Sequence, residues 1–160
     1  SLALYEMTFS AIKLHLYGDR LLSDLTPLGS TLIAPELISA EDGATRLSGS
    51  RCSACGTLSF PCAEVCSVCL SVDIAPYLLA PDGSLYSYSI VHQAPPGWEV
   101  PYVLGYVDLA DGVRVLAHIH VAANQLAIGM PLQVSLGVVG QENETDRTTY
   151  VFVPKELHDA

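Results

Sequence analysis

Two pairs of cysteines constrain this chain more than any other feature of its 160 residues. Cys52 and Cys55 form one C-x2-C pair, Cys66 and Cys69 form a second, and ten residues separate the pairs. Two such knuckles can each present two sulfurs to one ion, and tetrahedral thiolate coordination suits zinc. Gly56 directly follows the first pair and permits the close backbone approach that a knuckle needs. The spacing therefore predicts a four-cysteine zinc site.

Two disulfides are the alternative use of the four cysteines, and the cellular compartment decides between the two. Residues 1–20 lack the basic start and unbroken apolar stretch of a signal peptide, because Glu6, Lys13 and Asp19 interrupt them. We therefore expect a cytoplasmic protein, and disulfides are rare in that reducing compartment. Iron is a second option, since four thiolates accept it too. A closed four-cysteine site leaves no position for water, so the expected zinc ion is structural.

The fifth cysteine, Cys62, lies between the pairs. It could replace Cys66 as a ligand, but the spacing of Cys66 and Cys69 mirrors the first knuckle better. A catalytic thiol would need a lowered pKa and a nearby base, and the sequence reveals neither. Packing, or simple tolerance of a cysteine at this position, is favoured over catalysis for Cys62.

Charge and hydropathy exclude other classes of protein. The chain carries 7 Lys and Arg against 17 Asp and Glu, a net charge of −10, so we expect no binding to nucleic acid. Residues 115–141 contain no charged side chain apart from histidine. Polar residues, Gly129 and Pro131 nevertheless interrupt that stretch before it reaches the length of a membrane-spanning helix, so we expect no membrane contact.

The chain divides into four predicted parts. Apolar residues at spacings of three and four predict a helix over residues 1–22. Scattered Pro and Gly over 23–50 indicate an extended arm, which lies either on its own domain or on a partner subunit. The predicted parts are the helix and arm (1–45), the zinc ribbon (46–78), a barrel (79–154) and a tail (155–160).

The barrel prediction rests on five runs with strand character, at residues 85–92, 102–109, 113–121, 132–139 and 148–153. Ala110-Asp111-Gly112 is a hairpin signal between the second and third runs. Residues 122–130 allow a short helical element between the third and fourth. This order is that of an OB-type barrel. The predicted fold class is mainly β, with an N-terminal helix and arm, a four-cysteine zinc ribbon and a five-stranded OB-fold barrel.

Three further side chains have functional potential. Trp98 is the single Trp of the chain and lies in a loop stiffened by prolines, so it could anchor an interface or fold back over the barrel mouth. His118 and His120 would face the same side of a strand and could share a metal, but no third ligand is evident. Structural imidazoles are the favoured interpretation. The sequence holds no phosphate loop, nucleophile elbow or His-Glu-x-x-His motif, so we assign no catalytic residue.

Several phrases over residues 45–154 resemble one known family. They are LSFP after the first knuckle, then PYVLGYVDLADGVRVLAHI, IGMPLQV and YVFVP. The chain is similar to the acyl-CoA-associated proteins that join a rubredoxin-like zinc ribbon to an OB fold. Phe60 and Pro61 match a Phe-Pro-Pro or Phe-Pro-Arg pattern of that family, whereas Cys62 departs from it.

The resemblance implies a non-catalytic subunit of a hetero-oligomer with a thiolase-like enzyme, whose catalytic residues belong to the partner chain. Such a complex cleaves a 3-oxoacyl-CoA by thiolysis, and the family includes subunits of aromatic-degradation thiolases such as benzoylsuccinyl-CoA thiolase. A bulky or aryl-substituted substrate is the favoured expectation. Acyl-CoA would bind at or near the subunit interface, where Arg46 and Arg51 are the nearest basic residues to its phosphates. The alternatives are an accessory subunit of an acyl-CoA hydratase or aldolase, and a nucleic-acid-binding OB module.

Overall fold

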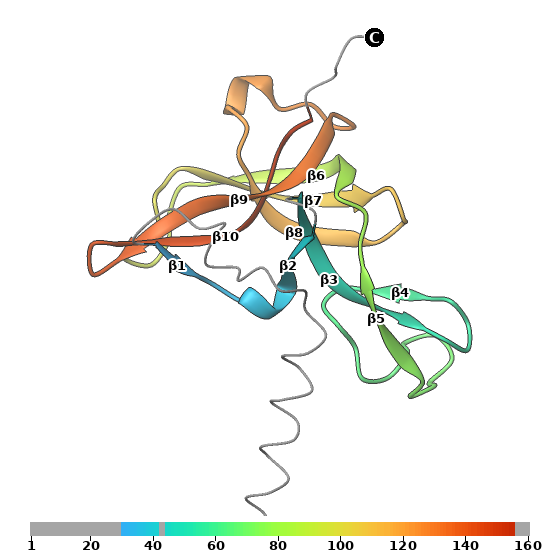
Figure 1. The fold of residues 1–160 in the computed structure, drawn as a ribbon. Helices are drawn as coiled ribbons and strands as arrows, with labels where there is room; N and C mark the ends of the chain where they lie inside the picture. The colour runs from blue at the N-terminus through green and yellow to red at the C-terminus, as the bar shows by residue number, and fades with distance from the viewer. Residues whose placement is uncertain (1–29, 42–43, 156–160) are drawn as a thin grey trace, which may run out of the picture.

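The computed structural model describes residues 30–41 and 44–155 (Figure 1). The helix predicted over 1–22, the start of the arm and most of the tail lie outside these residues. Within the described part, no helix has the length and apolar character needed to cross a membrane.

Five strands close into a barrel in the C-terminal part of the chain. They are β6 (Asp82–Val91), β7 (Tyr102–Leu109), β8 (Arg114–Ile119), β9 (Pro131–Glu142) and β10 (Thr145–Pro154). Around the barrel the order is β6-β7-β8-β10-β9, and β9 returns to pair with β6. All pairs are antiparallel except β8 with β10, which is parallel. The predicted five-stranded OB-like barrel is confirmed.

Apolar side chains at alternate positions of the strands fill the interior of the barrel. In β7 and β8 every second residue points inward and is buried, while the residues between them are more exposed. Phe152 of β10 and Val107 of β7 are completely buried at the centre. Burial of these apolar side chains is the main stabilising contribution to such a core.

The two connections predicted from the sequence, a hairpin between β7 and β8 and a short helical element between β8 and β9, are both present. Gly112, at a φ of 86°, completes the predicted hairpin between β7 and β8, and its N–H donates to the carbonyl of Leu109 at 2.9 Å. The helical element expected within 122–130 is a single 3-10 turn, η3 (Ala123–Gln125). Gly129, at a φ of 82°, and Pro131 follow soon after it.

The described part of the predicted arm is extended and paired with its own chain. β1 (Ser30–Leu32) runs parallel to β10 on the barrel, and the N–H of Ile33 donates to the carbonyl of Thr148 at 2.7 Å. The 3-10 turn η2 (Pro35–Leu37) leads into β2 (Ile38–Glu41), which pairs with β3. Of the two interpretations of the arm, residues 30–41 therefore follow the one in which it covers its own domain.

The long strand β3 (Ala44–Cys52) connects the barrel to the zinc ribbon (Figure 1). It pairs with β2, with β4 (Leu58–Ser59) and with β5 (Ile74–Leu78). Leu47 near its start belongs to the barrel core, whereas Cys52 at its end belongs to the ribbon. The ring of Phe60 also meets that of Tyr150 edge to face, with centroids 5.7 Å apart. The ribbon therefore has a base that packs on the barrel.

Candidate metal centre and barrel-mouth pocket

The two cysteine knuckles have the same backbone hydrogen bonds. The carbonyl of Cys52 accepts from the N–H of Gly56 at 2.8 Å, and the carbonyl of Cys66 accepts from the N–H of Leu70 at 3.0 Å. The N–H groups of Cys52 and Cys66 each donate to a carbonyl five residues later, both at 2.9 Å. Gly56 and Leu70 occupy equivalent positions with φ values of 77° and 60°. The sequence argument anticipated the role of Gly56 but not a leucine in the same conformation.

The knuckles bring the four predicted ligand sulfurs together. The Sγ atoms of Cys52 and Cys69 lie 3.6 Å apart, and those of Cys55 and Cys66 lie 3.5 Å apart. All four lie within 4.8 Å of one another. A tetrahedral ion with metal–sulfur bonds of about 2.3 Å requires sulfurs separated by about 3.8 Å. The donor set and its spacing therefore fit one tetrahedral metal ion.

The electrostatics of the cluster also favour a cation. Backbone N–H groups of Cys69 and Val68 lower the pKa of Cys66 to about 6, and a hydrogen bond from Thr57 lowers the pKa of Cys55. The N–H of Ser71 acts in the same direction on Cys69, but the sulfurs of Cys55 and Cys52 outweigh it and raise the pKa of Cys69 to about 12. Because neighbouring thiolates repel one another, a bound cation is needed for all four to lose their protons.

Cys62 points away from this cluster. Its thiol donates to the carbonyl of Gly49 on β3 at 2.9 Å. The four-sulfur group is formed without it. This placement agrees with the packing role favoured for Cys62.

The two candidate CoA-binding arginines both lie on β3 but point in different directions. Arg46 pairs with Ser39 of β2, and Arg51 pairs with Leu58 of β4 and Ala75 of β5. Five residues of strand separate them by about 17 Å, and an odd separation places their side chains on opposite faces. At this separation the two arginines cannot bind one phosphate together. Of the two, Arg51 is the one that is exposed beside the first knuckle and therefore near the metal centre.

Trp98 folds back against the barrel through the loop of residues 92–101, here called the Trp98 loop. The N–H of Gln141 on β9 donates to the carbonyl of Gly97 at 2.7 Å. The backbone of Trp98 forms an isolated β-bridge with that of Gly140. A Cβ atom at position 140 would collide with the carbonyl of Gly97. The absence of a side chain at position 140 therefore allows the loop to lie alongside β9 in an antiparallel bridge. Part of Trp98 remains exposed, and its place in an interface stays a prediction.

The indole of Trp98 belongs to an aromatic stack of three rings that all contact one another, with Tyr102 and His118. Its ring lies 5.5 Å from that of His118 at an interplanar angle of 8°, and the ring of Tyr102 lies 4.6 Å from His118 on a 27° tilt. The rings of Trp98 and Tyr102 are themselves 6.1 Å apart, so the three centroids form a triangle in which His118 stacks on both aromatic rings. Among the described residues, no third metal-binding side chain joins His118 and His120.

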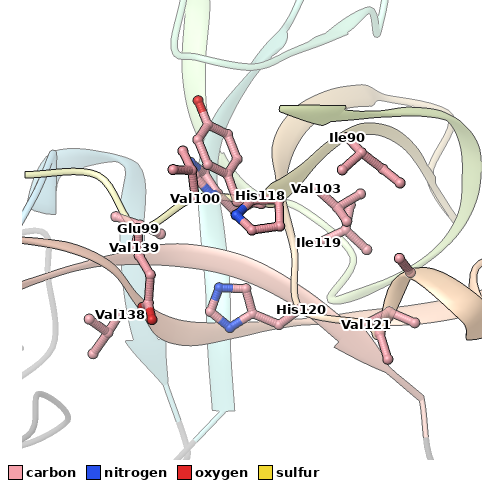
Figure 2. A pocket seen from close by; sticks show the side chains of 14 residues that line it. Ile90, Glu99, Val100, Val103, His118, Ile119, His120, Val121, Val138 and Val139 are labelled. Carbon is pink, nitrogen blue, oxygen red and sulfur yellow. The ribbon is translucent and has the colours of Figure 1, made fainter. Parts of the chain in front are cut away.

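A pocket of about 530 Å³ lies beside this stack at the barrel mouth. Figure 2 shows the imidazoles of His118 and His120 between Val138 and Val139 on one side and a second apolar wall on the other, formed by Ile90, Val103 and Ile119. His120 packs over Gly137, where a Cβ would come within 2.7 Å of its Cε1 atom. Burial lowers the pKa of both histidines, and the charge of His120 lowers that of His118 further. Sequence reasoning missed this pocket, because residues from four separate segments form it.

Comparison with known proteins gives the family of the chain. Residues 41–73 match the family described as "ChsH2, rubredoxin-like zinc ribbon domain", and residues 77–136 match "ChsH2, C-terminal OB-fold domain". The "Benzoylsuccinyl-CoA thiolase subunit BbsA" of Thauera aromatica is 32% identical over 111 residues, which are 68% of this chain and 77% of that protein. The chain belongs to the ChsH2 family of zinc-ribbon and OB-fold proteins. This confirms the family predicted from the sequence.

Other ChsH2-family relatives have different names. The "Probable enoyl-CoA hydratase alpha subunit" of Thermomonospora curvata is 38% identical over 89 residues, which are 54% of this chain and 28% of that protein. Our ChsH2-family chain therefore spans little more than a quarter of that relative. A solved structure titled "Ltp2-ChsH2(DUF35) aldolase" superimposes with a TM-score of 0.57 at 35% identity, covering 68% of this chain and 84% of that one.

Proposed function

We propose that this chain is a non-catalytic, zinc-binding subunit of a thiolase-type acyl-CoA acyltransferase complex in the cytoplasm. The observation that carries the proposal is the similarity to a thiolase subunit over 77% of that subunit's length. The matched stretch of 111 residues is longer than the ribbon or the barrel alone, so the likeness is not confined to one of the two modules.

The chemistry of the metal centre supports a non-catalytic role. Cys52, Cys55, Cys66 and Cys69 would hold zinc with all four of its positions filled by sulfur. A zinc ion in such a closed site contributes folding free energy and does not activate water. Cys62, the remaining thiol, donates to a backbone carbonyl. The catalytic nucleophile and base are therefore assigned to the partner chain.

The proposed reaction is the thiolysis of a 3-oxoacyl-CoA. Overall, the bond between C2 and C3 breaks, the C3 acyl group is transferred to the sulfur of free CoA, and C2 takes up the proton that the CoA thiol loses, so two acyl thioesters result. The partner chain's nucleophile and base would carry this transfer. A bulky or aryl-substituted acyl group is the favoured substrate, because the relative from Thauera is named for benzoylsuccinyl-CoA. Acyl-CoA would lie at or near the subunit interface, and Arg51 is the better placed of the two arginines to meet a phosphate.

An accessory role in a hydratase or aldolase complex is the second candidate function. It is favoured by the names of the hydratase subunit and of the aldolase structure among the relatives. In this case the same subunit architecture would serve a different catalytic chain. Binding to nucleic acid is not proposed, since the chain carries a net charge of −10.

Affinity capture of the full-length chain from its native cytoplasm tests the proposal. We expect a thiolase-like chain to be recovered by mass spectrometry, one zinc ion per copy of this subunit, and thiolysis of 3-oxoacyl-CoA by the complex but not by the isolated chain. Recovery of a hydratase or aldolase chain would replace the thiolase assignment with the second candidate. Thiolysis by the isolated subunit would overturn the non-catalytic role.

A further inference from the structure

The second knuckle of the zinc ribbon carries an exposed cluster of aliphatic side chains. Four residues within eight positions are largely open to solvent: Val65 (47% exposed), Val68 (70%), Leu70 (75%) and Val72 (78%). We call them the second-knuckle patch. Single exposed apolar residues are ordinary on protein surfaces, whereas clusters of them mark interaction sites.

The fold itself does not require these side chains, as the first knuckle demonstrates. The two knuckles share their backbone hydrogen bonds and a left-handed residue after the second cysteine. The first knuckle achieves this geometry with Ala54 and Gly56, where the second has Val68 and Leu70. Leucine is disfavoured at a φ of 60°, a conformation that glycine adopts freely. The second knuckle thus keeps larger side chains at a cost, without burying them against the other residues that the structure describes.

The charge around the patch indicates the kind of surface that covers it. Glu64 precedes the patch and Asp73 follows it, and both are exposed. No Lys or Arg occurs in the sequence between Arg51 and Arg114. A second copy of the chain that docked through the same patch would therefore bring acidic groups against acidic groups, which is unfavourable. A groove with aliphatic walls and a lysine or arginine rim would be complementary.

We propose that the second-knuckle patch is the docking surface for the catalytic subunit, inserting Val68 and Leu70 into an aliphatic groove with a basic rim. This inference rests on the proposed function, since it names the surface that the partner would contact. The patch provides the buried apolar centre of the interface, and Glu64 and Asp73 provide its charged edge.

The first knuckle supplies the variant that tests the inference. Val68→Ala with Leu70→Gly gives the second knuckle the residues that the first already uses, so the zinc site is expected to stay intact. The binding of each variant to the captured catalytic subunit would be measured by calorimetry, with zinc content and circular dichroism as checks of folding. We expect the double variant to bind about tenfold more weakly or worse, a loss typical of interface anchors. Ile128→Ala is the matched control, because Ile128 is an aliphatic residue with 63% exposure that lies outside the ribbon. The affinity of this variant for the catalytic subunit should equal that of the wild type.

The outcomes separate this inference from the proposed function. Failure of the wild-type chain to bind any catalytic subunit would overturn both. Wild-type binding with an unchanged affinity of the double variant would overturn the docking surface alone. Sedimentation that shows a wild-type homodimer, dissociated by the same two substitutions, would assign the patch to a second copy and also overturn the inference. Glu64→Gln with Asp73→Asn should lower the salt dependence of binding, as expected for an acidic edge facing a basic rim.

Discussion

Leu70 and Gly56 share one left-handed backbone conformation, but substitution at the two positions should affect stability differently. Gly56→Ala introduces a Cβ at a φ of 77° and should reduce the free energy of unfolding of the zinc-loaded protein by about 1–2 kcal/mol. Leu70→Gly relieves the same strain but makes the unfolded chain more flexible, so it should leave stability within about 1 kcal/mol of wild type. Denaturant titration of both variants checks this pair. A large loss of stability for Leu70→Gly alone would show that the leucine supports the ribbon internally.

Four of the five cysteines are expected to bind the metal, and Cys62 is not. Cys55→Ser removes one of the four sulfurs and should reduce bound zinc to well below one ion per chain. Cys62→Ser keeps a donor toward the Gly49 carbonyl and should retain full zinc content. Elemental analysis of the two purified variants gives the comparison. Loss of zinc in the Cys62 variant would contradict the ligand set described here.

The burial of His118 predicts how the stability of the protein depends on pH. Burial and the neighbouring His120 lower its pKa below the ordinary value of 6.5, so folding favours the neutral imidazole. The unfolded chain therefore binds more protons near and below pH 6.5 than the folded chain does. Stability should be fully present above pH 6.5 and should decline as the pH falls through 6.5 toward the lower folded pKa.

Nuclear magnetic resonance of the His118 ring provides the measurement. We expect its titration midpoint below 6.5 in the wild type and closer to 6.5 in Trp98→Ala, because removal of the stacked indole admits water to the imidazole. A wild-type midpoint at or above 6.5 would refute the burial argument.

The Trp98 loop is the element whose position depends most on a missing side chain. Gly140→Ala would place a methyl group against the carbonyl of Gly97, so the loop must move away from β9. We expect a loss of about 1–3 kcal/mol in unfolding free energy, as in other overpacked sites, and faster hydrogen exchange in residues 92–101. Gly112→Ala is a useful comparison, since an added Cβ there meets no atom within 4 Å although its φ is positive. Faster exchange in residues 92–101 should thus be confined to the Gly140 variant.

At the level of elements, the sequence predicts what depends on local pattern and fails where distant segments meet. Alternating apolar residues and the Ala110-Asp111-Gly112 signal located the barrel strands to within a few residues, and the cysteine spacing located the metal centre. The parallel pairing of β1 with β10 joins residues more than 100 positions apart, and no local pattern records it. The second-knuckle patch was also missed, because Leu70 in isolation resembles an ordinary core residue.

At the scale of the whole molecule, the described residues form a four-cysteine ribbon, which we expect to depend on its metal, and a barrel with its own core. The barrel core is built largely from β6 to β10, so it should survive removal of the metal, whereas the knuckles have no apolar interior to replace it. After treatment with a chelator, we expect hydrogen exchange to increase strongly over residues 52–73 and little over β7 and β8. Leu47, Leu58 and Phe60 pack on or in the core, so β3 and β4 should respond to an intermediate degree. Cooperative loss of protection in the barrel would indicate that ribbon and barrel fold as one unit.

The position of Trp98 also determines what light can report about this protein. Because the chain has a single Trp, emission excited at wavelengths that indole absorbs and tyrosine does not comes from one place, the stack at the barrel mouth, where the guanidinium of Arg147 lies 5.7 Å from the indole. A change in emission wavelength or lifetime would therefore describe the loop and pocket, not an average over the molecule. The ribbon holds Tyr77 but no Trp, so it would contribute nothing to that indole spectrum. An indole titration can thus follow events at the barrel mouth without any added label, and compared with a measurement of bound metal it distinguishes them from events at the ribbon.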